Sequence, residues 1–231
     1  LLLGSSIINR INHKGLKPNI HKHAVPGATI NSMMIDVSLF NLKIFDTVIV
    51  YIGGNDAANK TEHELVEENY DKLVSQLKTA NPTLKVYLSK IAPRGDVDVS
   101  PINAIVDRLA AHHSVNVIDI FKSFHDKHGR VCMSYIGNDS IHPSNSGTKR
   151  IAGTMDKVVS IVNDFESIVY AKPVARFGNR SNAFNARETH APCLKCGEIN
   201  HDTRSCRHHS PVTCWGCGFS GHKQQHCWKH A

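Results

Sequence analysis

The sequence predicts an α/β fold with a mostly parallel sheet, followed by a small metal-binding region. Strand-like apolar segments alternate with helix-like segments in the order typical of parallel α/β domains. This alternation stops after Tyr170, and six of the seven cysteines then lie between Cys193 and Cys227. We expect an α/β domain at 1–168, a flexible basic linker at 169–192, and two metal-binding units at 193–206 and 214–227.

The strand predictions come from short apolar and β-branched segments. Thr47–Ile52 reads Thr-Val-Ile-Val-Tyr-Ile, which is typical of a strand buried on both faces. The chain opens on the apolar run Leu1–Gly4, without a basic segment typical of a signal peptide, so we expect a piece of a longer protein that starts inside a strand. Further predicted strands are Asn19–Ala24, Lys85–Ile91 and Val115–Ile120.

The helix predictions come from apolar spacing and from end signals. Glu62–Thr79 has apolar residues near helical spacing, and Thr61 is a plausible N-cap. Pro101–His112 starts with a proline, which the first turn of a helix tolerates, and ends near two histidines that complement the helix dipole. The remaining predicted helices are Ile7–Lys14 and Asn145–Phe165.

Positive charge is concentrated in the C-terminal part. Residues 171–231 hold nine Lys and Arg against three Asp and Glu, whereas residues 1–170 hold eighteen against seventeen. A basic tail favours a polyanionic partner, because neutralised phosphates release counterions; a solvated, disordered tail explains the charge equally well. No run of apolar residues is long enough for a transmembrane helix.

Two segments share the spacing C-x2-C-x4-H-x4-C. Three thiolates and one imidazole form a closed tetrahedral shell for Zn²⁺, which suits a structural site. Segments this short cannot bury a core, so zinc binding must supply their folding free energy. The sequence thus predicts two structural zinc ions, whose ligands are Cys193, Cys196, His201 and Cys206 in the first unit and Cys214, Cys217, His222 and Cys227 in the second.

The residues between these ligands support the zinc prediction and indicate a ligand. Gly197 and Gly218 follow the second cysteine of each unit, where a tight turn favours positive φ. Exposed aromatic side chains can stack on bases, and lysine and arginine can contact phosphates. The candidate nucleic-acid contacts are Leu194, Lys195, Ile199, Arg204, Arg207, Trp215, Phe219 and Lys223.

This spacing resembles the CCHC zinc knuckles of retroviral nucleocapsid and retrotransposon proteins. The resemblance implies single-stranded RNA or DNA as the partner. A knuckle that binds protein is the alternative, and His226 could compete with its neighbour Cys227 as a ligand. Clustered cysteines interleaved with histidines favour metal binding in a reducing compartment, so we expect an intracellular protein, cytoplasmic, nuclear or both.

Four short motifs in the α/β region carry candidate chemistry. Ser6 follows the first strand, Gly27 the second and Asn55 the strongest one, and Asp139 and His142 precede the last helix. In a parallel sheet, these motifs gather at the carboxyl edge. We expect Ser6 as nucleophile, His142 as general base and Asp139 as its orienter. The backbone N–H groups of Ser6 and Gly27, with the Asn55 amide, would form an oxyanion hole.

The order of these motifs resembles the SGNH/GDSL hydrolase family over most of the α/β region. Ser6, Gly27, Asn55 and His142 match the Ser, Gly, Asn and His of its four blocks. The resemblance implies a three-layer α/β/α, flavodoxin-like fold and ester hydrolysis without metal. One departure is that the chain reads Gly-Ser-Ser where the family has Gly-Asp-Ser, so a catalytically inactive scaffold that binds RNA or protein is the alternative.

An esterase-like domain followed by zinc knuckles resembles the first-open-reading-frame proteins of some non-LTR retrotransposons. We therefore expect a mobile-element-derived protein that binds nucleic acid and hydrolyses a carboxylic ester, either a lipid or an acetyl ester. The expected partners are single-stranded RNA or DNA and a small ester or lipid. Self-association is left open by the sequence.

Overall fold

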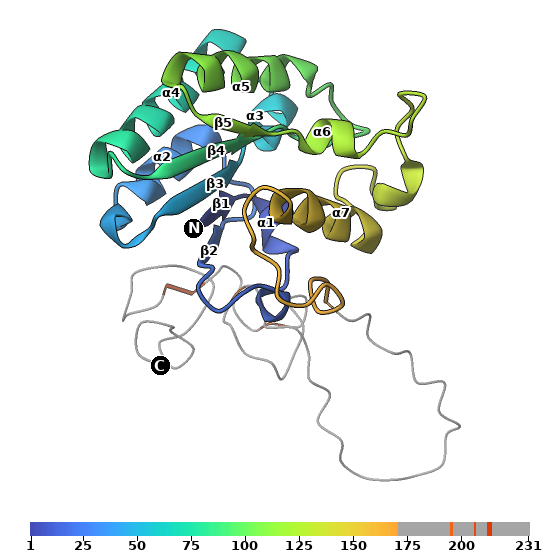
Figure 1. Ribbon diagram of the computed structural model, residues 1–231. Helices are drawn as coiled ribbons and strands as arrows, with labels where there is room; N and C mark the ends of the chain where they lie inside the picture. The colour runs from blue at the N-terminus through green and yellow to red at the C-terminus, as the bar shows by residue number, and fades with distance from the viewer. Residues whose placement is uncertain (171–194, 196–205, 207–211, 214–231) are drawn as a thin grey trace. The chain divides into compact units, whose positions relative to one another are not determined.

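A five-stranded parallel sheet forms the centre of the α/β domain. The computed structural model describes residues 1–170 and positions 195, 206, 212 and 213. The chain divides into units Leu1–Pro173 and Val174–Ala231, and the α/β domain lies in the first. The strand order is β2-β1-β3-β4-β5, and every pair is parallel (Figure 1). The strands are β1 (Leu2–Gly4), β2 (Lys22–Ala24), β3 (Thr47–Tyr51), β4 (Lys85–Ser89) and β5 (Asn116–Ile118).

Helices cover both faces of this sheet. In Figure 1, α2, α4 and α5 lie on one side of the sheet, and α1 and α7 lie on the other. The predicted α/β fold with a parallel sheet is therefore confirmed, and its strand order is that of flavodoxin-like folds. The helices are α1 (Ser6–Asn9), α2 (Ile30–Val37), α3 (Gly54–Ala58), α4 (His63–Ala80), α5 (Ser100–His113), α6 (Ile120–Ser123) and α7 (Asn145–Asp156), and the 3-10 turns are η1 (His13–Gly15), η2 (Leu42–Ile44) and η3 (Met133–Tyr135).

The core is built where the apolar sequence patterns require it. The middle of β3 is buried on both faces, as a strand between two helical layers must be. Each observed strand lies inside a segment that the sequence predicts as a strand. On α4, the buried side chains recur at helical spacing and form one apolar stripe against the sheet: Val66, Tyr70, Leu73, Val74 and Leu77.

Several helix boundaries differ from the prediction. The predicted helix Ile7–Lys14 is replaced by α1, which ends at Asn9, and by the separate 3-10 turn η1. The last helix ends at Asp156 rather than at Phe165, because the Asp156 carboxylate accepts the N–H groups of Ile161 at 2.8 Å and Val162 at 2.7 Å and so holds a turn. Val162 then pairs in an antiparallel bridge with Leu16, which a continued helix would prevent. The N-cap of α4 is Glu62, without a side-chain capping bond, so the predicted Thr61 cap is wrong.

Helices α2, α3 and α6 were not predicted from the sequence. Helix α2 begins with a capping box, in which the Thr29 hydroxyl accepts the Ser32 N–H and the Ser32 hydroxyl bonds back to Thr29. Its buried residues, Ile30, Met33 and Val37, have helical spacing. The capping residues and the apolar spacing are both visible in the sequence, so α2 could have been predicted.

The parallel register brings the carboxyl ends of the central strands to one edge of the sheet. Gly4 at the end of β1 is level with Ala24 of β2 and with Tyr51 of β3. The loops after these strands therefore meet at this edge, as predicted for parallel sheets. Across the described residues, no helix is both long enough and apolar enough for a bilayer crossing.

Candidate active site

The predicted catalytic motifs meet in one cavity at the carboxyl edge of the sheet. Its volume is about 310 Å³. Ser6, Gly27, Asn55 and His142, which the sequence separates widely, all line it. The remaining lining residues are Ser5, Ile7, Pro26, Tyr51, Gly54, Arg94 and Ile141.

Ser6 is placed by the tight connection from β1 into α1. A Cβ atom at Gly4 would lie 2.4 Å from Ile8 Cγ1 and 2.8 Å from the Tyr51 carbonyl oxygen, so only glycine fits where β1 turns. Ser5 caps α1 in an extended conformation, and Ser6 is the first helical residue. The Ser6 hydroxyl oxygen lies 3.1 Å from His142 Nε2, within hydrogen-bonding distance.

His142 is held from its other ring nitrogen by Asp139. Its Nδ1 lies 2.8 Å from Asp139 Oδ2. The second carboxylate oxygen accepts the backbone N–H groups of Ile141 at 3.0 Å and His142 at 2.9 Å. These bonds, above all those from the backbone and side chain of His142, hold the pKa of Asp139 well below its ordinary value. The Asp139 carboxylate is therefore ionised at neutral pH, where His142 would act as a base.

The loop that carries this pair is fastened through its backbone. The Gly137 N–H donates to the His142 carbonyl at 2.7 Å, and the Gly95 N–H donates to the Ser140 carbonyl at 2.7 Å. Ser140 has a φ of 58°, in the left-handed region that non-glycine residues rarely adopt. A few hydrogen bonds and one unfavourable backbone conformation thus fix the position of His142.

Asn55, in the first turn of α3, and Gly27, in the loop after β2, belong to segments that are bonded to each other. The Asn55 side-chain nitrogen donates to the Ala28 carbonyl at 2.8 Å, which uses one of its two amide hydrogens. Gly27 adopts a φ of 81°, where glycine is favoured. The buried carboxyl of Asp56 accepts the Ile30 N–H at 3.1 Å, and burial raises the pKa of this group. The short helix α3, which carries Asn55, is therefore anchored to the start of α2.

Arg94 is a residue of this cavity that the sequence analysis did not identify. Its Nη1 donates to the Gly54 carbonyl at 2.8 Å. Its Nε and Nη2 donate to the two carboxylate oxygens of Asp96 at 2.9 and 2.7 Å, and these bonds lower the pKa of Asp96. Arg94 follows the predicted strand Lys85–Ile91, so the rule that sites collect after parallel strands could have found it.

Most of the predicted zinc and nucleic-acid residues lie outside the described part of the chain. Of them, the structure describes only Lys195, whose carbonyl accepts the Val212 N–H at 2.8 Å, and Cys206, which is half-buried. The zinc prediction therefore stays a prediction for all eight ligands: Cys193, Cys196, His201, Cys206, Cys214, Cys217, His222 and Cys227. The same holds for the candidate nucleic-acid contacts Leu194, Lys195, Ile199, Arg204, Arg207, Trp215, Phe219 and Lys223.

Comparison with known families identifies the α/β domain. A profile of the GDSL-like lipase/acylhydrolase family matches residues 7–150, which is more than half of the chain. The chain belongs to this family. No curated protein sequence matches it significantly.

Solved structures of low sequence identity share the fold. The lipase/acylhydrolase from Enterococcus faecalis has 16% identity and a TM-score of 0.59, covering 69% of this chain and 93% of its own. The family 3 carbohydrate esterase of Clostridium thermocellum has 17% identity and a TM-score of 0.56, with coverages of 68% and 92%. The OSK domain of Drosophila Oskar has 18% identity and a TM-score of 0.55, with coverages of 68% and 86%.

Proposed function

We propose that the α/β domain is a serine esterase that hydrolyses carboxylic esters of lipid or acetyl type. One observation carries this proposal: Ser6 Oγ lies 3.1 Å from His142 Nε2, while Asp139 Oδ2 lies 2.8 Å from the other ring nitrogen. An alcohol, an imidazole and a carboxylate in this order form the unit that activates a hydroxyl for attack on a carbonyl. Membership of the acylhydrolase family points to the same chemistry.

Each member of this unit has a distinct part in the reaction. The Ser6 oxygen adds to the carbonyl carbon of the ester while its proton moves to His142 Nε2. The ionised Asp139 holds the Nδ1 proton and stabilises the imidazolium that forms. His142 then returns its proton to the departing alkoxide, which leaves an acyl group on Ser6. A water molecule, deprotonated by His142, releases the carboxylic acid and regenerates the serine.

The negative charge that develops on the carbonyl oxygen needs hydrogen-bond donors. We assign this role to the backbone N–H groups of Ser6 and Gly27 and to the second amide hydrogen of Asn55. These three residues line the same cavity as His142, and the bond from Asn55 to Ala28 leaves one amide hydrogen over. A preorganised donor of this kind is typically worth about 3–4 kcal/mol of transition-state stabilisation.

The alternative is an inactive scaffold, and a hydrolysis assay separates the two. The full chain is assayed with a short-chain p-nitrophenyl ester, alongside Ser6→Ala. We expect turnover to fall by about 10⁴-fold or more in Ser6→Ala, because the nucleophile is lost. Ser38→Ala is a matched control, since Ser38 is an exposed serine at the end of α2. Turnover that Ser6→Ala retains, or a wild-type chain without turnover, would refute the proposal.

We propose a second function for the C-terminal region: zinc-dependent binding of single-stranded nucleic acid, as expected of a mobile-element-derived protein. Two segments with the identical spacing C-x2-C-x4-H-x4-C support it, since chance repetition of four ligands at one spacing is improbable. Their basic surroundings favour phosphates. In this reading, two structural zinc ions fold the knuckles, and Trp215 and Phe219 stack on bases.

Filter binding of a single-stranded RNA tests this second function. A chelator should abolish binding, because each knuckle needs its metal to fold. Cys217→Ser, which removes one ligand, should weaken binding strongly, whereas Cys132→Ser should not, since Cys132 lies in the α/β domain. Affinity should also fall steeply with salt. RNA affinity that survives complete zinc removal would contradict the proposal without affecting the esterase.

A further inference from the structure

Helices α4 and α5 bring two histidines and an aspartate together away from the candidate active site. His112 and His113 are the last two residues of α5, and Asp71 lies on the neighbouring α4 (Figure 1). Because α5 leads into β5, this end of α5 lies near the amino ends of the strands, whereas the esterase residues follow their carboxyl ends. The cluster is therefore separate from the Ser6 cavity.

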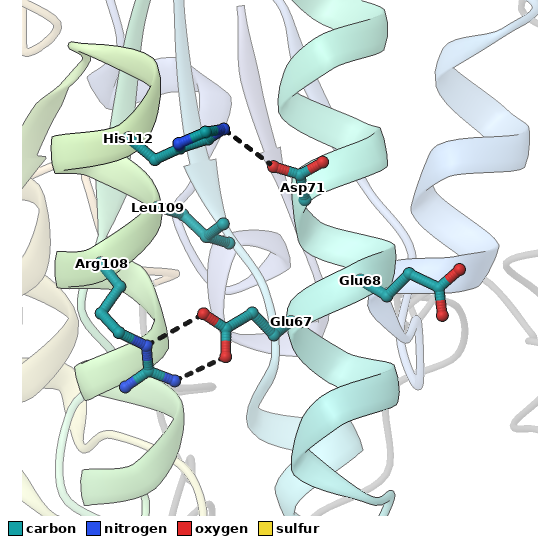
Figure 2. Close-up of a pocket in the computed structure, with 6 residues that line it drawn as sticks. All are labelled: Glu67, Glu68, Asp71, Arg108, Leu109 and His112. Carbon is teal, nitrogen blue, oxygen red and sulfur yellow. Dashed lines mark hydrogen bonds and ion pairs between the residues drawn. The ribbon is translucent and has the colours of Figure 1, made fainter.

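Both imidazoles face one carboxylate oxygen. Nε2 of His113 lies 2.7 Å from Asp71 Oδ1, and Nε2 of His112 lies 4.0 Å from the same oxygen, as Figure 2 shows for His112. The three candidate ligand atoms lie within 4.8 Å of one another. One hydrogen bond between His113 and Asp71 would suffice to tie the two helices together. That bond does not account for the His112 ring, which also points toward Asp71 although its side chain is 72% exposed (Figure 2).

The charges around the cluster favour a cation. A cavity of about 370 Å³ is lined by Glu67, Glu68, Asp71, Arg108, Leu109 and His112. Glu67 and Asp71 point toward α5, whereas Glu68 points away from it (Figure 2). Arg108 pairs with Glu67 and Lys72 pairs with Glu68, so these two carboxylates already have cationic partners, and Lys78 donates to the His113 carbonyl. The negative charge of Asp71 thus faces two imidazoles.

We propose that Asp71, His112 and His113 bind a Zn²⁺ ion that fastens α5 to α4. Two imidazole nitrogens and one carboxylate oxygen are donors that zinc accepts, and water from the open cavity can complete the shell. With zinc–ligand distances of about 2.0–2.1 Å, neighbouring ligands of a tetrahedral site lie about 3.3 Å apart. The present separations of 2.7 and 4.0 Å lie on either side of that value. Zinc binding therefore requires the exposed His112 ring to move closer to Asp71 and the bond between His113 and Asp71 to lengthen by about 0.6 Å.

Counting zinc on the full chain by native mass spectrometry tests this proposal. Zinc is removed with a chelator and restored at micromolar concentration, in small excess over all candidate sites. We expect His112→Ala to hold one zinc fewer than the wild type, while leaving the bond between His113 and Asp71 in place. Asp71→Asn should lose the same single ion. His128→Ala, which removes an exposed histidine elsewhere, should keep the wild-type count.

Substitution with Co²⁺ separates this ion from any metal in the knuckles. Thiolate ligands give cobalt charge-transfer absorption, which a site of two histidines and an aspartate lacks. His112→Ala should therefore lose part of the visible d–d absorption and keep the charge-transfer bands. Removal of the exposed His112 side chain should leave the circular dichroism spectrum unchanged. An unaltered zinc count in His112→Ala, or filling of the site only at millimolar zinc, would leave a simple interhelical hydrogen bond and overturn the proposal.

Discussion

Two His–Asp pairs in this molecule, His142 with Asp139 and His113 with Asp71, consist of the same residue types but are suited to different roles. His142 gives Nδ1 to Asp139 and leaves Nε2 for the Ser6 hydroxyl. His113 gives Nε2 itself to Asp71, and its neighbour there is a second imidazole rather than a hydroxyl. The first pair sits in a loop beside a cavity, and the second joins two packed helices. The nitrogen that faces the carboxylate, and the third group present, therefore decide whether a histidine is suited to proton transfer or to structure.

Asp139→Asn tests the first pair most severely. An amide cannot hold the Nδ1 proton as the carboxylate does, so we expect kcat for p-nitrophenyl ester hydrolysis to fall by about 10³–10⁴-fold. Asp126→Asn is a matched control, because Asp126 is likewise a loop aspartate that accepts backbone N–H groups, those of His128 and Arg130. Equal activity of the two variants would mean that Asp139 does not orient the base.

Asn55→Ala tests the proposed oxyanion-hole donor beside the pair of His142 and Asp139. Loss of one oxyanion donor should lower kcat by about 10²–10³-fold with little change in KM. Asn59→Ala, at the exposed end of α3, should leave kinetics unchanged. Because Asn55 also bonds to Ala28, the melting temperature of each variant should be measured with its kinetics. A KM effect alone would show that Asn55 binds the substrate rather than the transition state.

The pH dependence of stability gives the smallest expected effect. Folding lowers the pKa of Asp139 below its ordinary value of 3.8, so the folded state holds fewer protons on this group than the unfolded state around that pH. Its stabilisation is therefore fully present above about pH 5 and is lost as the pH falls through the lowered pKa. Since the side chain is 47% exposed, we expect less than about 1 kcal/mol.

Urea unfolding of the wild type and Asp139→Asn at several pH values measures this effect. The two midpoints should differ most near neutral pH and converge in acid. A difference that grows as the pH falls would contradict the assignment of a lowered pKa to Asp139.

The sequence predicted the sheet and the residues around its carboxyl edge well, and for a physical reason. Parallel strands end at a common edge, so motifs after three strands must meet there whatever their separation along the chain. Ser6, Gly27, Asn55 and His142 do line one cavity. The hydrogen bond between His142 and Asp139 could also be predicted from the sequence, because residues three positions apart in one loop lie close together.

Other features depended on contacts that no local pattern reveals. The early end of α7 follows from the turn that the Asp156 carboxylate holds, although the apolar spacing continues beyond it. The position of Arg94 after a predicted strand marks its loop as part of the site edge, but the contacts with Asp96 and the Gly54 carbonyl that hold its guanidinium in the cavity are not visible in the sequence. The meeting of His113 with Asp71 required the packing of α4 against α5, and sequence analysis alone assigned the two histidines only to the helix dipole.

The few hydrogen bonds that hold the His142 loop affect how the activity should respond to heating. A continuous apolar core holds the sheet in place. The loop instead depends on a few hydrogen bonds, such as the one from Gly95 to Ser140, and Ser140 has a left-handed backbone conformation. Segments of this kind open at a lower free-energy cost than the body of a domain. Hydrolysis should therefore disappear at a lower temperature than the sheet melts, and it should return on cooling without any need for refolding.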